Sequence, residues 1–264
     1  MHNIEAPRAP GAAAPLTILY RDDWLVAVDK PAGLLVHRSA LDAHEERFAV
    51  QLVRDQIGRH VHPVHRLDKG TSGVLLFALD RATAALLGGA FERQEVDKTY
   101  LAVVRGHPPE TGVIDHPLTR RFDPAERRRP APDQAPQAAR TRFRRLAATE
   151  LPYRVDRYPT SRYALLELAP ETGRRHQIRR HLKHLSHPII GDATFGKGRH
   201  NRLFAELFGV SRLLLACTRM RLAHPHGAAA LDLRAPPAAE FATVLAALGW
   251  SAEAAGELPT PVDS

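Results

Sequence analysis

The stretch that most constrains the fold is Val64–Asp80, which reads VHRLDKGTSGVLLFALD. Its second half, Val74–Leu79, is an unbroken apolar run that is too short for an ordinary helix, so it predicts a buried strand. The first half is a polar loop whose glycines permit a ligand to approach closely. In that loop Asp68 lies between Arg66 and Lys69, and these cations favour its ionised form near neutral pH. The carboxylate is thus a candidate nucleophile or electrostatic stabiliser, and the alternative is that it only closes a turn through a local salt bridge.

The string HRLDKGTSG, residues 65–73, is similar to the central motif of the RluA-type pseudouridine synthases, in which His-Arg-Leu-Asp precedes a variable pair and Thr-Ser-Gly. Two other segments resemble the same family in the same order. Residues 29–33, Asp-Lys-Pro-Ala-Gly, match its opening signature, which in itself is a plain strand-to-loop turn. Residues 172–192 match a third motif, Thr-Gly-Arg-x-His-Gln-Ile-Arg-x-His with a later Pro-Ile-x-Gly-Asp. The joint chance occurrence of three ordered motifs is remote, and the resemblance covers residues 16–250.

The resemblance implies a role for each matching residue. It implies that Asp68 is the catalytic aspartate of a uridine isomerase, that Arg179 pairs with it, and that Ile178 lines the base pocket. Tyr100, in a predicted strand from Lys98 to Gly106, matches a tyrosine that packs against the target base. An aromatic face suits a uracil taken out of its stack, although a tyrosine in such a strand is more often a packing residue. The expected catalytic residues are thus Asp68, Tyr100 and Arg179, and the expected substrate-binding residues also include His65, Arg66, Thr71, Arg174, His176 and Gln177.

Hydrophobic patterns along the chain predict short strands alternating with a few helices. Strands are expected within Leu16–Asp29 as a hairpin, and at Tyr163–Leu168, Arg212–Leu222 and Ala229–Leu233. Helices are expected at Phe48–Ile57, from an N-cap at Asp80 as far as Glu95, and at Glu240–Leu248. These elements are compatible with the fold that the resemblance implies, without establishing it. That fold is α+β, with a long mixed, mostly antiparallel sheet bent around a central cleft and flanked by helices.

Length and composition bound the domain organisation. With 264 residues, 44% of them hydrophobic, the chain can build a real core in one large domain or two small ones. We expect one catalytic domain at residues 16–250 between flexible tails at residues 1–15 and 251–264. No apolar run is long enough for a bilayer, and the Ala/Pro-rich start lacks a signal-peptide layout, so a cytoplasmic protein is expected. The single cysteine, Cys217, lies in an apolar run and is expected to be a buried thiol in a reducing compartment.

The charge of the chain favours an anionic partner. A net charge of +8 and a pI near 10.1 leave RNA, DNA and a membrane surface open. Aromatic residues make up only 6%, which argues against a long stacking platform and for folded, duplex-like RNA. Residues 118–145 hold nine arginines and four prolines and predict a mobile loop or insertion. This loop is either a solvated charge run or a phosphate-contacting arm; we favour the arm, with Arg127, Arg128 and Arg129 as RNA-backbone contacts.

Neither a metal nor another cofactor is expected. Four histidines, His176, His181, His184 and His187, lie close together in the sequence. They have no cysteine or carboxylate at ligand spacing, and the surrounding arginines would repel a cation. The chain carries no P-loop or dinucleotide fingerprint. The isomerisation that the resemblance implies requires none of these groups.

The resemblance therefore implies an RNA uridine-to-pseudouridine isomerase. The segments DDWLVAVDKPAGLLVHRS and HPIIGD, with no separate RNA-binding domain ahead of them, resemble a branch of the family that acts at uridine 65 of tRNA. We accordingly expect tRNA as the partner and a monomeric enzyme, with ribosomal RNA as the alternative substrate. Two alternatives come from other classes: a basic RNA-binding protein without catalysis, and a metal-dependent nuclease that uses histidine and aspartate.

Overall fold

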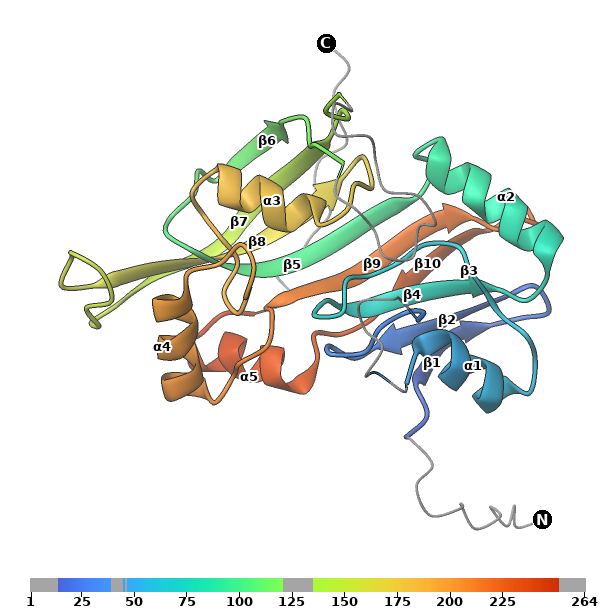
Figure 1. Ribbon diagram of the computed structural model, residues 1–264, viewed down its shortest axis with the longest axis horizontal. Coiled ribbons are helices and arrows are strands. Elements are labelled where there is room, and N and C mark those ends of the chain that lie inside the picture. The colour runs from blue at the N-terminus through green and yellow to red at the C-terminus, as the bar shows by residue number, and fades with distance from the viewer. Residues whose placement is uncertain (1–13, 39–44, 46, 121–134, 252–264) are drawn as a thin grey trace.

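The structure is a computed structural model, and it describes residues 14–38, 45, 47–120 and 135–251 (Figure 1). Within these residues the strands are β1 (Thr17–Arg21), β2 (Leu25–Lys30), β3 (His62–Pro63), β4 (Ser72–Ala78), β5 (Asp97–Arg105), β6 (Thr111–Asp115), β7 (Arg140–Leu151), β8 (Ser161–Pro170), β9 (Leu215–Ala223) and β10 (Ala230–Arg234). The helices are α1 (Ala49–Ile57), α2 (Arg81–Glu92), α3 (Gln177–His184), α4 (Gly198–Phe208) and α5 (Ala239–Ala247).

These strands form one mixed sheet in the order β1-β2-β4-β9-β5-β8-β7-β6, with β10 paired to β9 and β3 paired to β4. Every pairing is antiparallel except that of β4 with β9. The predicted strand at Val74–Leu79 is β4, and all of its residues are buried. The prediction of an α+β fold with a mostly antiparallel sheet is thus confirmed.

The contact between β4 and β9 depends on a glycine. The parallel pairing joins Ser72 to Ala216 and Gly73 to Cys217. Gly73 has a φ of +107°, and a Cβ at this position would lie 2.0 Å from the carbonyl oxygen of Cys217. Only glycine permits this approach. The loop that carries Asp68 therefore enters the sheet where β4 first meets β9.

Helices cover both faces of the sheet. Alternate residues of β5 belong to two separate clusters of buried side chains, as expected for a strand buried on both faces. Ala102 and Val104 pack in the cluster that includes residues of α1, α2 and α3, whereas Leu101 and Val103 pack with residues of α4 and α5. Ile178 and Leu182 bury α3 in the first cluster, and Figure 1 shows α3 lying across β5 and β8. This packing fixes the third motif above the sheet.

Most of the predicted elements are confirmed. The N-terminal hairpin is β1 and β2, and Asp80 caps α2 by accepting a hydrogen bond from the backbone N–H of Thr83 at 2.8 Å. That helix ends at Glu92 rather than Glu95. Cys217 is buried in β9, as predicted. Among the described residues no helix is long and apolar enough to cross a membrane.

One prediction about the arginine-rich segment 118–145 was wrong. Its last six residues are not part of a loop but begin β7, which pairs with β6 and β8. Thr141 and Phe143 point into the sheet's buried side, while Arg142 and Arg144 form ion pairs with Glu171 and Glu167 at 2.9 Å each. The period-two alternation was present in the sequence, but the density of arginines concealed it. Residues 121–134 lie outside the described residues.

Candidate active site

The loop before β4 holds Asp68 through its own backbone and through the loop after β2. The N–H of Thr71 donates to the carbonyl of Asp68 at 3.0 Å, which closes a tight turn. The N–H of Gly33 donates to the carbonyl of Lys69 at 2.8 Å. The opening signature and the central motif are therefore joined directly, and the position of Asp68 depends on both.

A buried cation lies beneath these two loops. The Lys30 side chain is fully buried, and its Nζ donates to the carbonyls of Pro31, Leu34 and Lys69 at 2.9, 2.7 and 3.3 Å. Burial lowers the pKa of Lys30 to about 7, although the nearby negative charge of Asp68 acts in the opposite direction. Our sequence interpretation gave this segment only a turn. In the structure its lysine also ties two loops together.

Arg179, in the first turn of α3, is held between two carboxylates. Its Nε and Nη2 donate to the two oxygens of Asp192 at 2.7 and 2.9 Å, and its Nη1 donates to Asp68 Oδ2 at 3.0 Å. Burial alone would lower the pKa of Arg179, but the hydrogen bonds and charges of the two aspartates raise it above its ordinary value. The two-pronged contact with Asp192 fixes the plane of the guanidinium. The third nitrogen is thereby aimed at Asp68.

Asp192 is the more fully engaged of the two carboxylates. Its Oδ1 also accepts hydrogen bonds from the backbone N–H groups of Thr194 and Phe195, each at 2.9 Å. Burial would raise the pKa of Asp192, but the hydrogen bonds from Arg179 and these amides outweigh it and hold the pKa below its usual range. Asp192 is thus a permanently charged anchor for the arginine.

Two rings complete the surroundings of the Arg179–Asp68 pair. The Arg179 guanidinium carbon lies 5.1 Å from the centroid of the Phe195 ring, a cation–π distance. His176 Nε2 lies 3.8 Å from Asp68 Oδ1, and the backbone of His176 has a φ of +55° just before α3 begins. For a residue that is not glycine this left-handed conformation is uncommon, and it persists where the surroundings enforce it.

Two cavities meet at Asp68. One has a volume of about 690 Å³ and extends past Gly33 and Asp192 towards Arg212. The other, of about 670 Å³, extends past Ile178 towards Tyr100. Asp68 and Arg179 line both. Each volume lies in the range that small-molecule sites occupy, so a nucleotide can be accommodated beside the carboxylate.

The second cavity has an apolar wall made by Tyr100, Ile178 and Leu215. The side chains of Tyr100 and Ile178 are 9% and 7% exposed. Burial raises the pKa of Tyr100 well above its ordinary value, so the phenol stays neutral. A neutral aromatic ring beside an aliphatic side chain provides a surface against which a flat base can pack.

Two of the expected substrate-binding residues make hydrogen bonds within the protein. His65 Nε2 accepts from the N–H of Leu76 in β4 at 3.0 Å, and its ring stacks on Phe91 with centroids 5.0 Å apart. Gln177, at the start of α3, is 5% exposed, and its Nε2 donates to the carbonyl of Arg140 and to Thr141 Oγ1, both at 3.0 Å. Both residues therefore shape the site, and His65 Nε2 and Gln177 Nε2 already have partners within the protein.

The other residues expected to bind the substrate differ in how deeply they are buried. Thr71 is only 2% exposed, next to the Asp68 turn. Arg66 lines both cavities, whereas Arg174 is half-buried, lines only the second, and donates through Nε to the carbonyl of Ala138 at 3.0 Å. Arg127, Arg128 and Arg129, which we expected to contact RNA, lie outside the described residues.

The histidine-rich third motif does not gather a metal site in the described part of the chain, where no group of three or more His, Cys, Asp or Glu side chains is placed to hold an ion. His181 is buried and bonds through its ring nitrogens to Thr141 Oγ1 at 2.9 Å and to the carbonyl of His116 at 3.1 Å. It is a structural residue that fastens α3 to the sheet.

Sequence reasoning missed three residues that build the site, namely Lys30, Asp192 and Phe195. The first two stand within the motif strings, Lys30 in the opening signature and Asp192 at the end of Pro-Ile-Ile-Gly-Asp. A buried-charge argument applied to each motif position would have found them, because a lysine or aspartate amid apolar neighbours needs a partner. Phe195 carried no such signal.

Known proteins of similar sequence show the family to which this chain belongs. Residues 24–184, more than half of the chain, match the model of the family described as RNA pseudouridylate synthase. The tRNA pseudouridine synthase C of Vibrio cholerae is 48% identical over 235 residues, covering 89% of this chain and 96% of that protein. That of Pasteurella multocida is 52% identical over 210 residues, covering 80% and 86%.

Solved structures agree. The human RNA Pseudouridylate Synthase Domain Containing 4 has a TM-score of 0.67 at 27% identity, covering 88% of this chain and 93% of that one. Human RNA Pseudouridylate Synthase Domain Containing 1 has a TM-score of 0.64 at 26% identity, covering 87% and 86%. The chain belongs to the RNA pseudouridylate synthase family, as its three ordered motifs predicted.

Proposed function

We propose that this pseudouridine synthase converts uridine 65 of tRNA to pseudouridine, with Asp68 as the nucleophile. The observation that carries the assignment of Asp68 is its place at the meeting of two cavities, with one oxygen fixed by Arg179 and the side chain 20% exposed. A carboxylate held in this way is oriented and accessible at once. The tRNA substrate is supported by the names of the relatives, which match the chain over most of its length.

In the proposed reaction the target uridine leaves its stack and packs against Tyr100 and Ile178. Asp68 attacks either C1′ of the ribose or C6 of the uracil, and the bond between C1′ and N1 breaks. The base rotates and C5 bonds to C1′. The Asp68 oxygen leaves C1′ as that bond forms, or, if it attacked C6, leaves C6 afterwards, so the carboxylate is regenerated. C5 then loses its proton while N1 gains one. Atoms and electrons balance without any co-reactant, since the product is an isomer of the substrate. Arg179 holds the carboxylate in its orientation through the first step.

Ribosomal RNA is the alternative substrate. The experiment that decides is to map pseudouridine in all cellular RNA from cells with and without the gene. We expect position 65 of tRNA to lose its pseudouridine while ribosomal RNA keeps every site. Loss confined to ribosomal RNA would overturn the tRNA assignment and leave the isomerase assignment in place.

Two other classes of function make different predictions. A metal-dependent nuclease would lose activity in EDTA, whereas we expect isomerisation to continue in EDTA with enough monovalent salt to keep tRNA folded. A purely RNA-binding protein would bind tRNA without releasing tritium from 5-tritiated uridine. Activity lost to EDTA and restored by zinc would revive the histidines of the third motif as ligands.

We further propose that the enzyme acts in the cytoplasm, without a cofactor, as a monomer. Asp68, Arg179 and Asp192 contact one another within a single chain, so a monomer can form this part of the site. Light scattering coupled to gel filtration should give a mass near 29.2 kDa. A mass of twice that value would contradict the monomer.

A further inference from the structure

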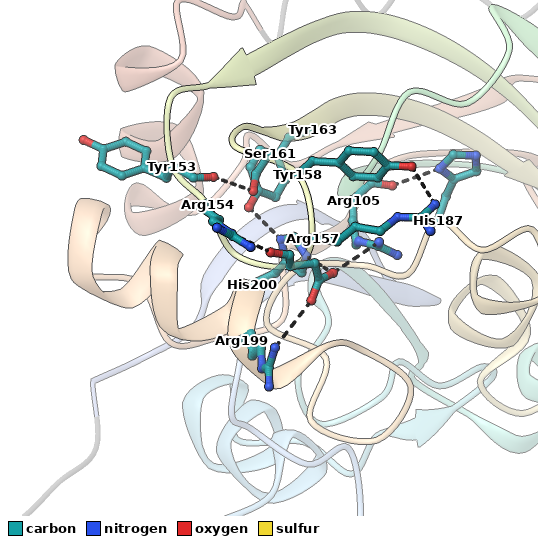
Figure 2. Close-up of polar contacts among 11 residues, drawn as sticks. Arg105, Tyr153, Arg154, Arg157, Tyr158, Ser161, Tyr163, His187, Arg199 and His200 are labelled. Carbon is teal, nitrogen blue, oxygen red and sulfur yellow. Dashed lines mark hydrogen bonds and ion pairs between the residues drawn. The ribbon is translucent and has the colours of Figure 1, made fainter.

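A basic and aromatic surface lies at the turn between β7 and β8 and the adjoining start of α4 (Figure 2), and none of its residues lines either cavity at Asp68. We call it the hairpin–α4 surface and define it by Tyr153, Arg154, Arg157, Tyr158, Lys197 and Arg199, all of them exposed. Residues 152–162 and 197–202 together carry six arginines and lysines and a single carboxylate, Asp156. No step of the isomerisation uses these side chains.

A buried network fixes the shape of this surface. Tyr163 is fully buried in β8, and its hydroxyl lies 2.7 Å from His200 Nδ1. His200, itself 3% exposed, reaches Asp156 Oδ2 through Nε2 at 3.3 Å, and Arg105 also contacts that oxygen at 3.4 Å. Ser161 adds a hydrogen bond to the carbonyl of Tyr153 at 2.8 Å. Figure 2 shows these groups clustered between the turn and α4. The hairpin–α4 surface is therefore held in place before anything binds it.

The same helix connects this surface to the active site. Thr194 and Gly209, which flank α4, both line the first cavity. Asn201, next to His200, accepts from the N–H of Gly191 at 2.9 Å and donates to the carbonyl of Asp192 at 3.2 Å. Arg199 follows Thr194 by five residues, so it lies within about 18 Å of the cavity's rim at the longest reach of the chain. The two places are therefore close enough for a ligand the size of a folded RNA to span the distance between them.

The chemistry of the surface favours RNA over a protein. Arg157 stacks on the ring of Tyr158, with its guanidinium carbon 4.6 Å from the centroid, and its Nη2 donates to the Tyr158 hydroxyl at 2.5 Å. A cation stacked on an exposed aromatic ring offers a phosphate contact and a platform for an unpaired base together. Asp156 is drawn towards His200 and Arg105, and the exposed Glu150 at the base of the turn bonds to Thr160. Six cations thus exceed two carboxylates, and the net charge of the surface is positive. An acidic, structured polymer with exposed bases matches these features.

We propose that the hairpin–α4 surface is a second contact site for the tRNA, which grips a part of the folded molecule away from the target uridine. This inference rests on the proposed function, and it adds that recognition of the whole tRNA is distributed over two sites. A short stem-loop that contains only the target uridine would occupy the Asp68 site and leave the second site empty. Full-length tRNA would occupy both.

The test replaces Arg154 and Arg157 with glutamine in the full-length enzyme and compares two substrates, complete tRNA and a stem-loop bearing the target uridine. For complete tRNA we expect KM to rise on the order of tenfold, and the salt dependence of log K to flatten by about 0.7–0.9 per lost phosphate contact. For the stem-loop neither quantity should change. The single-turnover rate at saturation should equal that of the wild type with both substrates.

A matched control replaces Arg54 and Arg59 with glutamine. Both are exposed arginines in or next to α1, and Figure 1 shows α1 at the other end of the sheet. This variant should bind both substrates as the wild type does. Equal KM values for Arg154→Gln/Arg157→Gln and the wild type on complete tRNA would overturn the proposal. Equal losses on both substrates would also overturn it, because they would show an effect on the fold or the Asp68 site. If the wild type modifies neither substrate, the proposed function fails instead.

A second variant separates stacking from charge. Tyr158→Ala should weaken binding of complete tRNA by at least about fivefold, the lower end of what loss of one base–aromatic stack produces. Tyr158→Phe keeps the ring and should bind as the wild type does. If both variants bind equally well, Tyr158 does not stack on a base; if both bind equally weakly, the hydroxyl rather than the ring is used. Either result removes the aromatic part of the proposal.

Discussion

The two carboxylates that hold Arg179 lie in opposite surroundings. The Asp192 side chain is 0% exposed and all its neighbours are donors from this chain: the arginine fork and two backbone amides. The Asp68 side chain is 20% exposed, receives one nitrogen of the same arginine, and borders two cavities. One aspartate is wholly enclosed by the protein, and the other is open on the side where a substrate can enter.

This difference assigns different tasks to chemically identical groups. Because Asp192 takes two of the three bonded nitrogens, Arg179 cannot rotate to follow Asp68 or a phosphate. Asp68 is therefore oriented by an arginine that is itself already fixed. Altering one carboxylate at a time separates the two tasks.

The largest effect is expected at the open carboxylate. Asp68→Asn keeps the shape of the side chain but removes the nucleophile, so turnover should fall by at least about 10³-fold. Affinity for tRNA and the melting temperature should stay close to wild type. Tritium release from 5-tritiated uridine in tRNA measures turnover, and filter binding measures affinity. Substantial remaining turnover would show that Asp68 is not the nucleophile.

A smaller loss is expected when the bridge between the two carboxylates is removed. Arg179→Met leaves Asp68 without its counter-charge and without the hydrogen bond that orients it, and kcat should fall by about 10²-fold. Arg179→Lys keeps the charge without the planar fork and should retain more activity than the methionine variant. If saturating tRNA restores a near-normal single-turnover rate to Arg179→Met, the arginine grips a phosphate and the ion pair is incidental.

Altering the enclosed carboxylate should affect stability more than chemistry. Asp192→Asn leaves a buried arginine short of one negative charge, which should cost about 3–5 kcal/mol of unfolding free energy. The kcat should fall by roughly tenfold, since Arg179 loses its fixed plane. Asp156→Asn is the matched control: that carboxylate also meets arginines but is 40% exposed, so the loss should stay below about 1 kcal/mol. If Asp192→Asn and Asp156→Asn lose the same unfolding free energy in urea, the enclosed position of Asp192 makes no difference to stability.

The smallest effect concerns the residue that fastens the Asp68 loop to β4. Burial lowers the pKa of His65 to about 3, so the folded protein keeps this ring neutral while the unfolded chain protonates it near pH 6.5. The stability contributed by His65 is complete above pH 6.5 and is lost as the pH falls towards 3. Between pH 6 and 4 the free energy of unfolding of the wild type should fall as the pH falls. In His65→Gln this fall should be shallower, by up to about 1.4 kcal/mol per pH unit. If the two proteins lose unfolding free energy at the same rate with pH, the His65 ring is not held neutral by burial.

The sequence allowed prediction of elements with a clear period or a clear motif. The apolar run of β4, the capped helix α2 and the strand around Tyr100 all carry local signals, and all three are present in the structure. The family motifs also marked the loops around Asp68 and Arg179. Local patterns are enough for such elements because the chemistry that defines each of them lies within a few residues.

Other features depend on parts of the chain that are far apart in sequence. The Arg179–Asp68 contact joins residues 111 positions apart, and its orientation by Asp192 becomes visible only once the turn at residues 191–195 folds against α3. Strand β7 was missed because a segment so rich in arginine is typical of an exposed loop. Only the structure shows that Glu167 and Glu171 lie beside it and pair with two of these arginines. Helix α4 and strand β6 were not predicted at all. Strand pairing determines β6 and β7, and packing between distant segments determines the others; sequence periodicity encodes neither.

The place of β9 has a consequence for synthesis of the protein. This strand comes late in the chain, yet it lies between β4 and β5 in the middle of the sheet. A nascent chain that has reached residue 212 already contains all the family motifs, but β4 and β5 still present unpaired edges to each other. Open edges are templates for aggregation, so β9 protects both edges when it inserts between them. Leu215, which lines the second cavity beside Tyr100, belongs to the same strand, so this cavity is completed only when β9 closes the sheet.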